Sequence, residues 1–223
     1  MSRLTVKAVL FDLDGTLVDS APDLGGALNL LLRRYDKPEL PLSRSRPLVS
    51  MGARGMLEIG FGLTPIHAEY EAMKTEYLAL YEANLCRDTR LFDGMQNLLT
   101  TLEQRAIPWG IVTNKHSRFT LPLLAALNLD RRAQCIISGD SVAQPKPHPG
   151  GLLAAADVLS VTPSTDIVYV GDDERDIQAA LAAKMTPVVA RYGYLGNGNP
   201  PTKWGAKLYI DYPLELLQTL AID

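Results

Sequence analysis

The sequence contains few of the residues that bind transition metals or form disulfides. Only two cysteines, Cys86 and Cys135, and three histidines occur among the 223 residues. None of them has the paired spacing of a zinc site or a redox motif. We therefore interpret both cysteines as free thiols and expect no transition-metal centre.

Long apolar runs and a strong charge imbalance are also absent. No uninterrupted apolar stretch reaches the roughly 18 residues of a membrane-spanning helix. Asp12 and Asp14 interrupt the first apolar run, which argues against a signal peptide. The formal net charge is only -3 at pH 7, so we expect neither nucleic acid nor a membrane as a partner. We predict a cytoplasmic monomer or small homo-oligomer that acts on a small molecule.

The chain does contain short apolar segments that alternate with helical patterns. Strand-like segments cover residues 7–14, 108–114, 134–140, 166–173, 187–193 and 206–211. Several are continuous apolar runs, as is typical of parallel strands that are covered on both faces. Helical patterns cover residues 94–105, 118–129, 150–159 and 174–184. This alternation predicts an α/β fold with a doubly wound, Rossmann-like parallel sheet.

Residues 20–88 depart from that alternation because they contain no convincing strand. Helical patterns cover residues 22–35, 46–59 and 65–85. The last has Thr64 as N-cap, Pro65 as its first helical position and an apolar stripe that starts at Ile66. We predict a small all-helical cap at residues 20–88, inserted after the first strand. The α/β core would then comprise residues 1–19 and 89–223.

Polar side chains gather where the predicted strands end, which is where open α/β sheets bind ligands. They are Asp12 and Asp14, Thr113 and Asn114, Lys146, and Asp172, Asp173 and Asp176. Asp12 and Asp14 are two residues apart in an extended segment, so both can face one pocket. Burying two neighbouring carboxylates is costly unless a cation joins them. Oxygen ligands without histidine or thiolate favour magnesium, and we expect Mg²⁺ here.

Four motifs in this order resemble the haloacid dehalogenase superfamily: "DLDGT", "TN", "KPHP" and "GDDERD". The helical insert after the first motif resembles the small cap of the phosphoglycolate phosphatase group. "LFDGM", "WGIVTNK", "RYGY" and the tail "WGAKLYIDYPLEL" are similar to the branch that contains N-acetylmuramic acid 6-phosphate phosphatases. The resemblance covers nearly the whole chain.

The resemblance implies a magnesium-dependent phosphomonoesterase that works through an aspartyl-phosphate. Asp12 would attack phosphorus. Asp14 would protonate the leaving alkoxide and then take a proton from the hydrolytic water. Lys146 would supply positive charge, and Thr113 would bind the phosphate oxygens beside Asn114.

The resemblance also implies a metal site. Asp12, Asp172 and the backbone carbonyl of Asp14 would hold Mg²⁺. Asp176 would orient a metal-bound water, and Asp173 is the alternative acid for that position.

The substrate and two other functions stay open at this point. 2-Phosphoglycolate and N-acetylmuramic acid 6-phosphate both carry a carboxylate, which Arg54 of the cap could bind. A phosphosugar mutase shares the first half of the chemistry. A phosphoaccepting receiver domain also gathers acids, a threonine and a lysine, but the cap and Asp14 argue against it.

Overall fold

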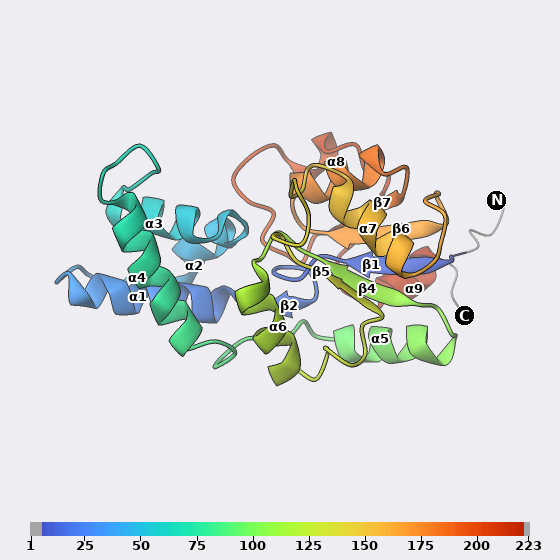
Figure 1. Ribbon diagram of the computed structural model, residues 1–223, viewed down its shortest axis with the longest axis horizontal. Helices are drawn as coiled ribbons and strands as arrows, with labels where there is room; N and C mark the ends of the chain where they lie inside the picture. Colours follow the sequence, from blue (N-terminus) through green and yellow to red (C-terminus); the bar gives the residue numbers. More distant parts are fainter. Residues whose placement is uncertain (1–5, 221–223) are drawn as a thin grey trace.

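The computed structural model describes residues 6–220, and a six-stranded parallel sheet lies at its centre (Figure 1). The strand order is β5 (Cys135–Ile137), β4 (Trp109–Val112), β1 (Ala8–Phe11), β6 (Ile167–Gly171), β7 (Thr186–Ala190) and β8 (Leu208–Ile210). Each strand pairs in parallel with its neighbours. Every residue of β1, β4 and β6 is buried, which explains their continuous apolar sequence. The predicted parallel sheet is confirmed.

Helices cover both faces of this sheet. They are α5 (Met95–Gln104), α6 (Ser117–Ala126), α7 (Gly150–Val158), α8 (Glu174–Ala182) and α9 (Glu215–Thr219), with a short 3₁₀ turn η2 (Pro201–Lys203). Leu98 of α5, Leu123 of α6 and Leu216 of α9 belong to one buried apolar cluster. Leu152 of α7 and Ala179 of α8 belong to another. Among residues 6–220, no helix has the length and apolar character needed to cross a membrane.

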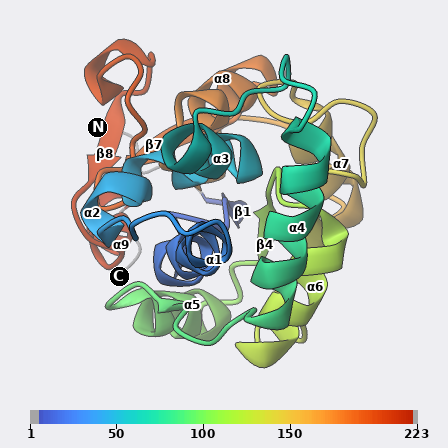
Figure 2. The ribbon, with the colours of Figure 1, turned by 90° about the vertical axis from the view of Figure 1, so that its left-hand side faces the viewer.

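A second group of helices lies to one side of the sheet and forms the cap (Figure 1). It consists of α1 (Ala21–Arg34), α2 (Leu42–Ser45), the 3₁₀ helix η1 (Arg46–Met51), α3 (Ala53–Phe61) and α4 (Tyr70–Ala83). These helices share a buried cluster of their own, with Leu28, Met56 and Tyr77 fully covered. Figure 2 shows α1, α3 and α4 in front of the sheet when it is viewed from the cap side. We keep residues 20–88 as the proposed cap boundaries.

The predicted start of the last cap helix is wrong. α4 begins at Tyr70, and Ile66 is 90% exposed instead of lying on the buried stripe. The cause is a local turn, in which the Nδ1 of His67 accepts from the backbone N–H of Thr64 at 3.0 Å and the N–H of His67 donates to the Thr64 carbonyl. Such local hydrogen bonds compete with helix formation. The later part of the stripe, including Met73 and Tyr77, is buried as expected.

The predicted helix at residues 46–59 is interrupted. Gly52 has a φ of 60°, in the left-handed region, and separates η1 from α3. The two pieces pack closely, since a Cβ added to Gly55 would lie 2.5 Å from the carbonyl oxygen of Leu48. Ser50 and the residues up to Ala53 at this bend line the cavity between cap and core that is described below.

A small ribbon that the sequence did not indicate joins the cap to the core. β2 (Val18–Asp19) pairs antiparallel with β3 (Arg90–Leu91), with Val18 opposite Leu91 and Asp19 opposite Arg90. Strands of two residues are too short to show an alternating pattern. The ribbon joins the two chain segments that connect the sheet with the cap helices.

Candidate active site

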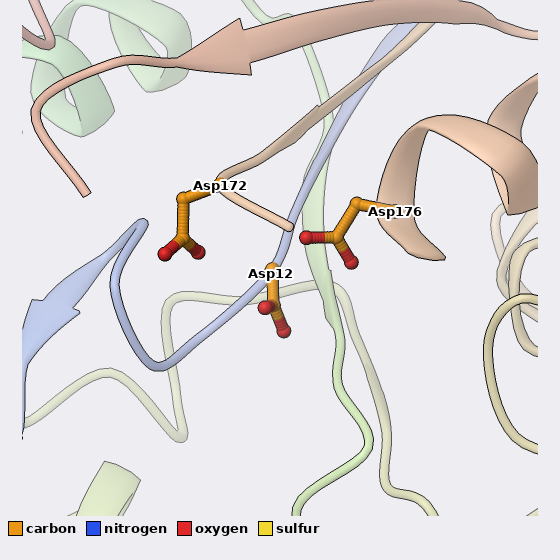
Figure 3. A group of neighbouring side chains, drawn as sticks. All are labelled: Asp12, Asp172 and Asp176. Carbon is orange, nitrogen blue, oxygen red and sulfur yellow. The ribbon is translucent and has the colours of Figure 1, made fainter. Parts of the chain in front are cut away.

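Three buried carboxylates converge at the carboxyl ends of β1 and β6 (Figure 3). Asp12 follows β1, Asp172 follows β6 and Asp176 lies in the first turn of α8. Each offers a carboxylate oxygen within 4.8 Å of the others. Asp12 is 8% exposed, and the other two are almost fully buried. The structure thus brings together three acids that are far apart in the chain.

Lys146 supplies positive charge to two of these acids. Its Nζ lies 2.8 Å from Asp12 Oδ1 and 2.6 Å from Asp176 Oδ1. It also donates to the hydroxyl of Tyr169 at 2.8 Å and to the Val112 carbonyl at 3.2 Å. Burial alone lowers the pKa of Lys146, but the two carboxylates outweigh it and raise that pKa to about 12. The ammonium is therefore charged near neutral pH, and its four contacts hold it in place.

Asn114 holds the loop that carries Lys146. Its Oδ1 accepts from the backbone N–H of Lys146 at 2.8 Å, and its Nδ2 donates to the Lys146 carbonyl at 3.0 Å. Both ends of the amide are therefore used within the protein. Thr113 is buried beside it, and its Oγ1 accepts from the N–H of Lys115 at 3.1 Å. Both residues line the central cavity, but the amide of Asn114 has a positioning task that the sequence did not indicate.

Asp172 has hydrogen bonds but no cation at ion-pair distance within residues 6–220. Its Oδ1 accepts from Thr16 Oγ1 at 3.0 Å, and its Oδ2 accepts from the N–H of Tyr194 at 2.8 Å. Burial, reinforced by the nearby Asp12 and Asp176, raises the pKa of Asp172 well above its usual range. Its carboxylate also touches Gly15, where a Cβ would come within 2.2 Å of Asp172 Oδ2. Glycine is therefore required in the first motif.

The acids fit a divalent cation. The carboxylates of Asp12, Asp172 and Asp176 carry three negative charges when ionised, and Lys146 offsets one. Asp12 Oδ1 is buried and lacks a hydrogen-bond partner, because Lys146 lies close to it but outside hydrogen-bond geometry. Carboxylate oxygens alone suit Mg²⁺ and not softer metals. The donor set is thus appropriate for magnesium.

Asp14 lies in a separate pair with Lys115, a residue that our sequence reasoning missed. Lys115 Nζ lies 3.1 Å from both carboxylate oxygens of Asp14, and Ser20 Oγ donates to Oδ1. The same ammonium lies 4.8 Å from the ring centroid of Tyr81 in the cap. Burial lowers the pKa of Lys115, but Asp14 and Tyr81 together outweigh burial, and the net pKa is raised. The "TNK" motif, with a lysine next to a strand end, was the available signal.

The first turn of α8 separates the roles of Asp173 and Asp176. Asp173 caps the helix by accepting from the N–H of Arg175 at 2.9 Å, while Asp176 Oδ2 accepts from the N–H of Asp173 at 3.0 Å. The guanidinium of Arg175 also binds Asp173 and donates to the Ser50 carbonyl of the cap at 2.7 Å. Burial raises the pKa of Asp173, but Arg175 outweighs it and lowers that pKa overall. Asp176, and not Asp173, therefore joins the acid group.

A cavity of about 600 Å³ lies between cap and core above these groups. Its core side includes Asp12, Asp14, Thr113, Lys115, Lys146 and Asp176, and its cap side includes Leu24, Val49, Ser50, Lys74, Tyr77, Leu78 and Tyr81. Arg54 is exposed in the first turn of α3 and is not among the lining residues. The structure does not bring Arg54 to the cavity, although Ser50, Met51, Gly52 and Ala53 of the same segment line it.

Comparisons with known proteins agree with this architecture. The family model of haloacid dehalogenase-like hydrolases matches residues 9–190. The chain is 44% identical over 215 residues to a phosphoglycolate phosphatase of Xanthomonas campestris pv. campestris, with 96% of each chain covered. It is 37% identical over 220 residues to an N-acetylmuramic acid 6-phosphate phosphatase of Pseudomonas aeruginosa, with 99% of this chain and 97% of the relative covered.

The fold is similarly shared. A crystal structure of a predicted phosphoglycolate phosphatase from Haemophilus somnus 129PT superposes with a TM-score of 0.84 at 27% identity, covering 96% of this chain and 97% of that one. Both the sequence and the fold match these proteins over nearly the full length of the chain. The protein therefore belongs to the haloacid dehalogenase-like hydrolase family, which its four motifs indicated.

Proposed function

We propose that the protein is a magnesium-dependent phosphomonoesterase that hydrolyses a small phosphorylated metabolite through an aspartyl-phosphate on Asp12. The group of Asp12, Asp172 and Asp176 beside the cavity, with the Lys146 ammonium paired to Asp12 and Asp176, is the observation that carries this proposal. The phosphatase names of two relatives that match nearly the full chain support it.

Charge neutralisation is the first task of the site. An anionic nucleophile that approaches a phosphate oxyanion is repelled by about 4 kcal/mol per charge pair at 4 Å and an effective dielectric of 20. Lys146 offsets part of this repulsion, and the Thr113 hydroxyl can donate to a phosphate oxygen. Mg²⁺ held by Asp12 and Asp172, with Asp176 beside them and the Asp14 carbonyl as a further ligand, would supply the remaining positive charge.

Proton transfer is assigned to Asp14. It lines the cavity beside Asp12 and would protonate the departing alkoxide. It would then accept a proton from the water that attacks the aspartyl-phosphate, which releases phosphate and regenerates Asp12. Lys115 and Ser20 fix the position of the Asp14 carboxylate for both steps.

The two named relatives bear on the substrate. Their names specify phosphoglycolate and N-acetylmuramic acid 6-phosphate, both of which are phosphate esters that carry a carboxylate. We propose an ester of this kind as the substrate. The cytoplasmic location and the absence of nucleic-acid and membrane partners stay predictions from composition.

Phosphate release from a panel of esters tests the proposal. Wild type, Asp12→Asn and a control, Asp157→Asn on the exposed surface of α7, are assayed with Mg²⁺ and with EDTA. We expect Mg²⁺-dependent release that Asp12→Asn removes and Asp157→Asn retains. Release of an isomerised phosphosugar without free phosphate would identify a mutase instead. A stable phosphoprotein without turnover would identify a receiver.

A further inference from the structure

The cavity is larger than a two-carbon substrate requires. Its volume of about 600 Å³ corresponds to roughly 20 water-sized groups at about 30 Å³ each. A phosphate group and a glycolate together would fill only a minor part of this space. The volume therefore favours an ester with a larger alcohol.

The cap side of the cavity is mainly apolar. Leu24, Val49 and Leu78 contribute aliphatic surface, and Tyr77 and Tyr81 contribute aromatic side chains. The hydroxyl oxygens of Ser50 and Tyr81 are fully buried and do not face the cavity space. The Tyr77 hydroxyl is already used, because it donates to the Leu24 carbonyl at 3.1 Å. An alcohol that matches this lining carries apolar substituents.

Most cations around the cavity already have a carboxylate partner that is either buried or bound through two hydrogen bonds. The pairs are Arg118 with Glu82, Arg175 with Asp173, Lys115 with Asp14, and Lys146 with Asp12 and Asp176. His116, the remaining titratable base in the lining, lies 3.3 Å from Asp140.

Lys74 of α4 differs from these cations. Its carboxylate contact is with Glu71, at 3.2 Å, and the side chain of Glu71 is 74% exposed. Such exposed i,i+3 pairs contribute little to stability. The ammonium of Lys74 is thus available to a carboxylate that enters the cavity from its cap side.

We propose, building on the phosphatase function above, that the preferred substrate is the phosphate ester of a sugar-sized alcohol with a carboxylate, and that Lys74 binds this carboxylate. Phosphate would lie at Lys146 and Asp12, while the carboxylate would lie at the cap. Lys74 then replaces Arg54 as the residue that recognises the second anionic group. Because Lys74 contacts a part of the substrate that does not react, it acts on binding and lowers KM.

A matched pair of esters tests this proposal. N-acetylmuramic acid 6-phosphate and N-acetylglucosamine 6-phosphate differ only in the lactyl ether that carries the carboxylate, and 2-phosphoglycolate provides a small carboxylate ester. Wild type, Lys74→Met, Lys74→Arg and a control, Lys207→Met at an exposed position outside the cavity, are compared by kcat/KM.

We expect wild type to prefer the carboxylated sugar ester over both others. Lys74→Met should raise KM for that ester about tenfold with little change in kcat, as is typical for the loss of one charge-assisted hydrogen bond. The same variant should change the KM for N-acetylglucosamine 6-phosphate by no more than about twofold, because that ester has no carboxylate for Lys74 to bind. Lys74→Arg should retain most of the preference for the carboxylated sugar ester, and Lys207→Met should retain all of that preference.

Two results overturn the inference while leaving the phosphatase function intact. One is a wild-type preference for 2-phosphoglycolate, and the other is an equal effect of Lys74→Met on both sugar esters. If wild type hydrolyses no phosphate ester at all, the proposed function itself fails. The three outcomes are distinguished by the same assay.

Discussion

Replacing Asp12, the proposed nucleophile, with asparagine should stabilise the metal-free protein while it removes activity. Burial raises the pKa of Asp12 from 3.8 to about 7, although Lys146 acts in the opposite direction. At about 1.4 kcal/mol per pH unit, this difference corresponds to about 4 kcal/mol of unfavourable free energy when Asp12 is ionised in the fold. Asparagine has the same shape without the charge, and Lys146 retains Asp176 as its partner.

The effect of pH follows from the direction of the shift. Between the unfolded pKa of 3.8 and the folded pKa of about 7, folded Asp12 keeps a proton that the unfolded chain has lost. The contribution of Asp12 to stability therefore falls as pH rises through this window and is constant above it. Wild type and Asp12→Asn should differ by less than about 1 kcal/mol near pH 4, and by about 4 kcal/mol in favour of the variant near pH 8.

Urea unfolding in EDTA at the two pH values measures this difference, with Asp157→Asn as the matched control. Adding Mg²⁺ should then stabilise wild type by mass action and stabilise Asp12→Asn much less, because the variant has lost a ligand. An Asp12→Asn variant that is no more stable than wild type near pH 8 would refute the electrostatic reasoning. Such a result would mean that groups of the protein already balance the negative charge of the Asp12 carboxylate without a metal ion.

Further predictions concern the first motif and the contact between α1 and the segment before β3. Gly15→Ala should lower the Mg²⁺-dependent activity at least about tenfold and cost about 1–3 kcal/mol of stability, because φ of Gly15 is 88° and the new Cβ would collide with Asp172. Calorimetry measures the loss of stability, and phosphate release measures the loss of activity. A variant that matches wild type in both would contradict the close contact between Gly15 and Asp172. Asp23 accepts hydrogen bonds from the backbone of Asp88 and from the backbone and hydroxyl of Thr89, so Asp23→Ala should cost about 2–4 kcal/mol in urea unfolding. Thr89→Val, which removes only one of these bonds, should cost about 1 kcal/mol.

The sheet and most of the acid group could be predicted from the sequence. β1 and β6 are continuous apolar runs because both faces are covered, and their carboxyl ends meet because the strands are parallel neighbours. The pairing of Asp12 with Asp172 across this edge follows directly. The choice between Asp173 and Asp176 could not be made, since it depends on how the helix cap orients each side chain.

The cap was less predictable because local hydrogen bonds and single glycines decide its details. The turn at Thr64 delays α4, the bend at Gly52 interrupts the predicted helix, and Arg54 lies outside the cavity. Lys115 was missed because its partners are distant in the sequence. Asp14 comes close through the pairing of β1 with β4, and Tyr81 comes close when the cap packs on the core. Contacts between cap and core have no periodicity that a single sequence could reveal.

The β2–β3 ribbon has a consequence for how this protein can diversify. Because Val18 lies opposite Leu91, the chain leaves the core and returns to it at points about 5 Å apart. The intervening segment can therefore change in length or sequence without altering the register of the six-stranded sheet. The residues proposed to break the phosphate ester lie outside this segment, while Lys74, proposed to bind the substrate carboxylate, lies within it. With these assignments, substrate choice and phosphate chemistry are separable properties of one chain.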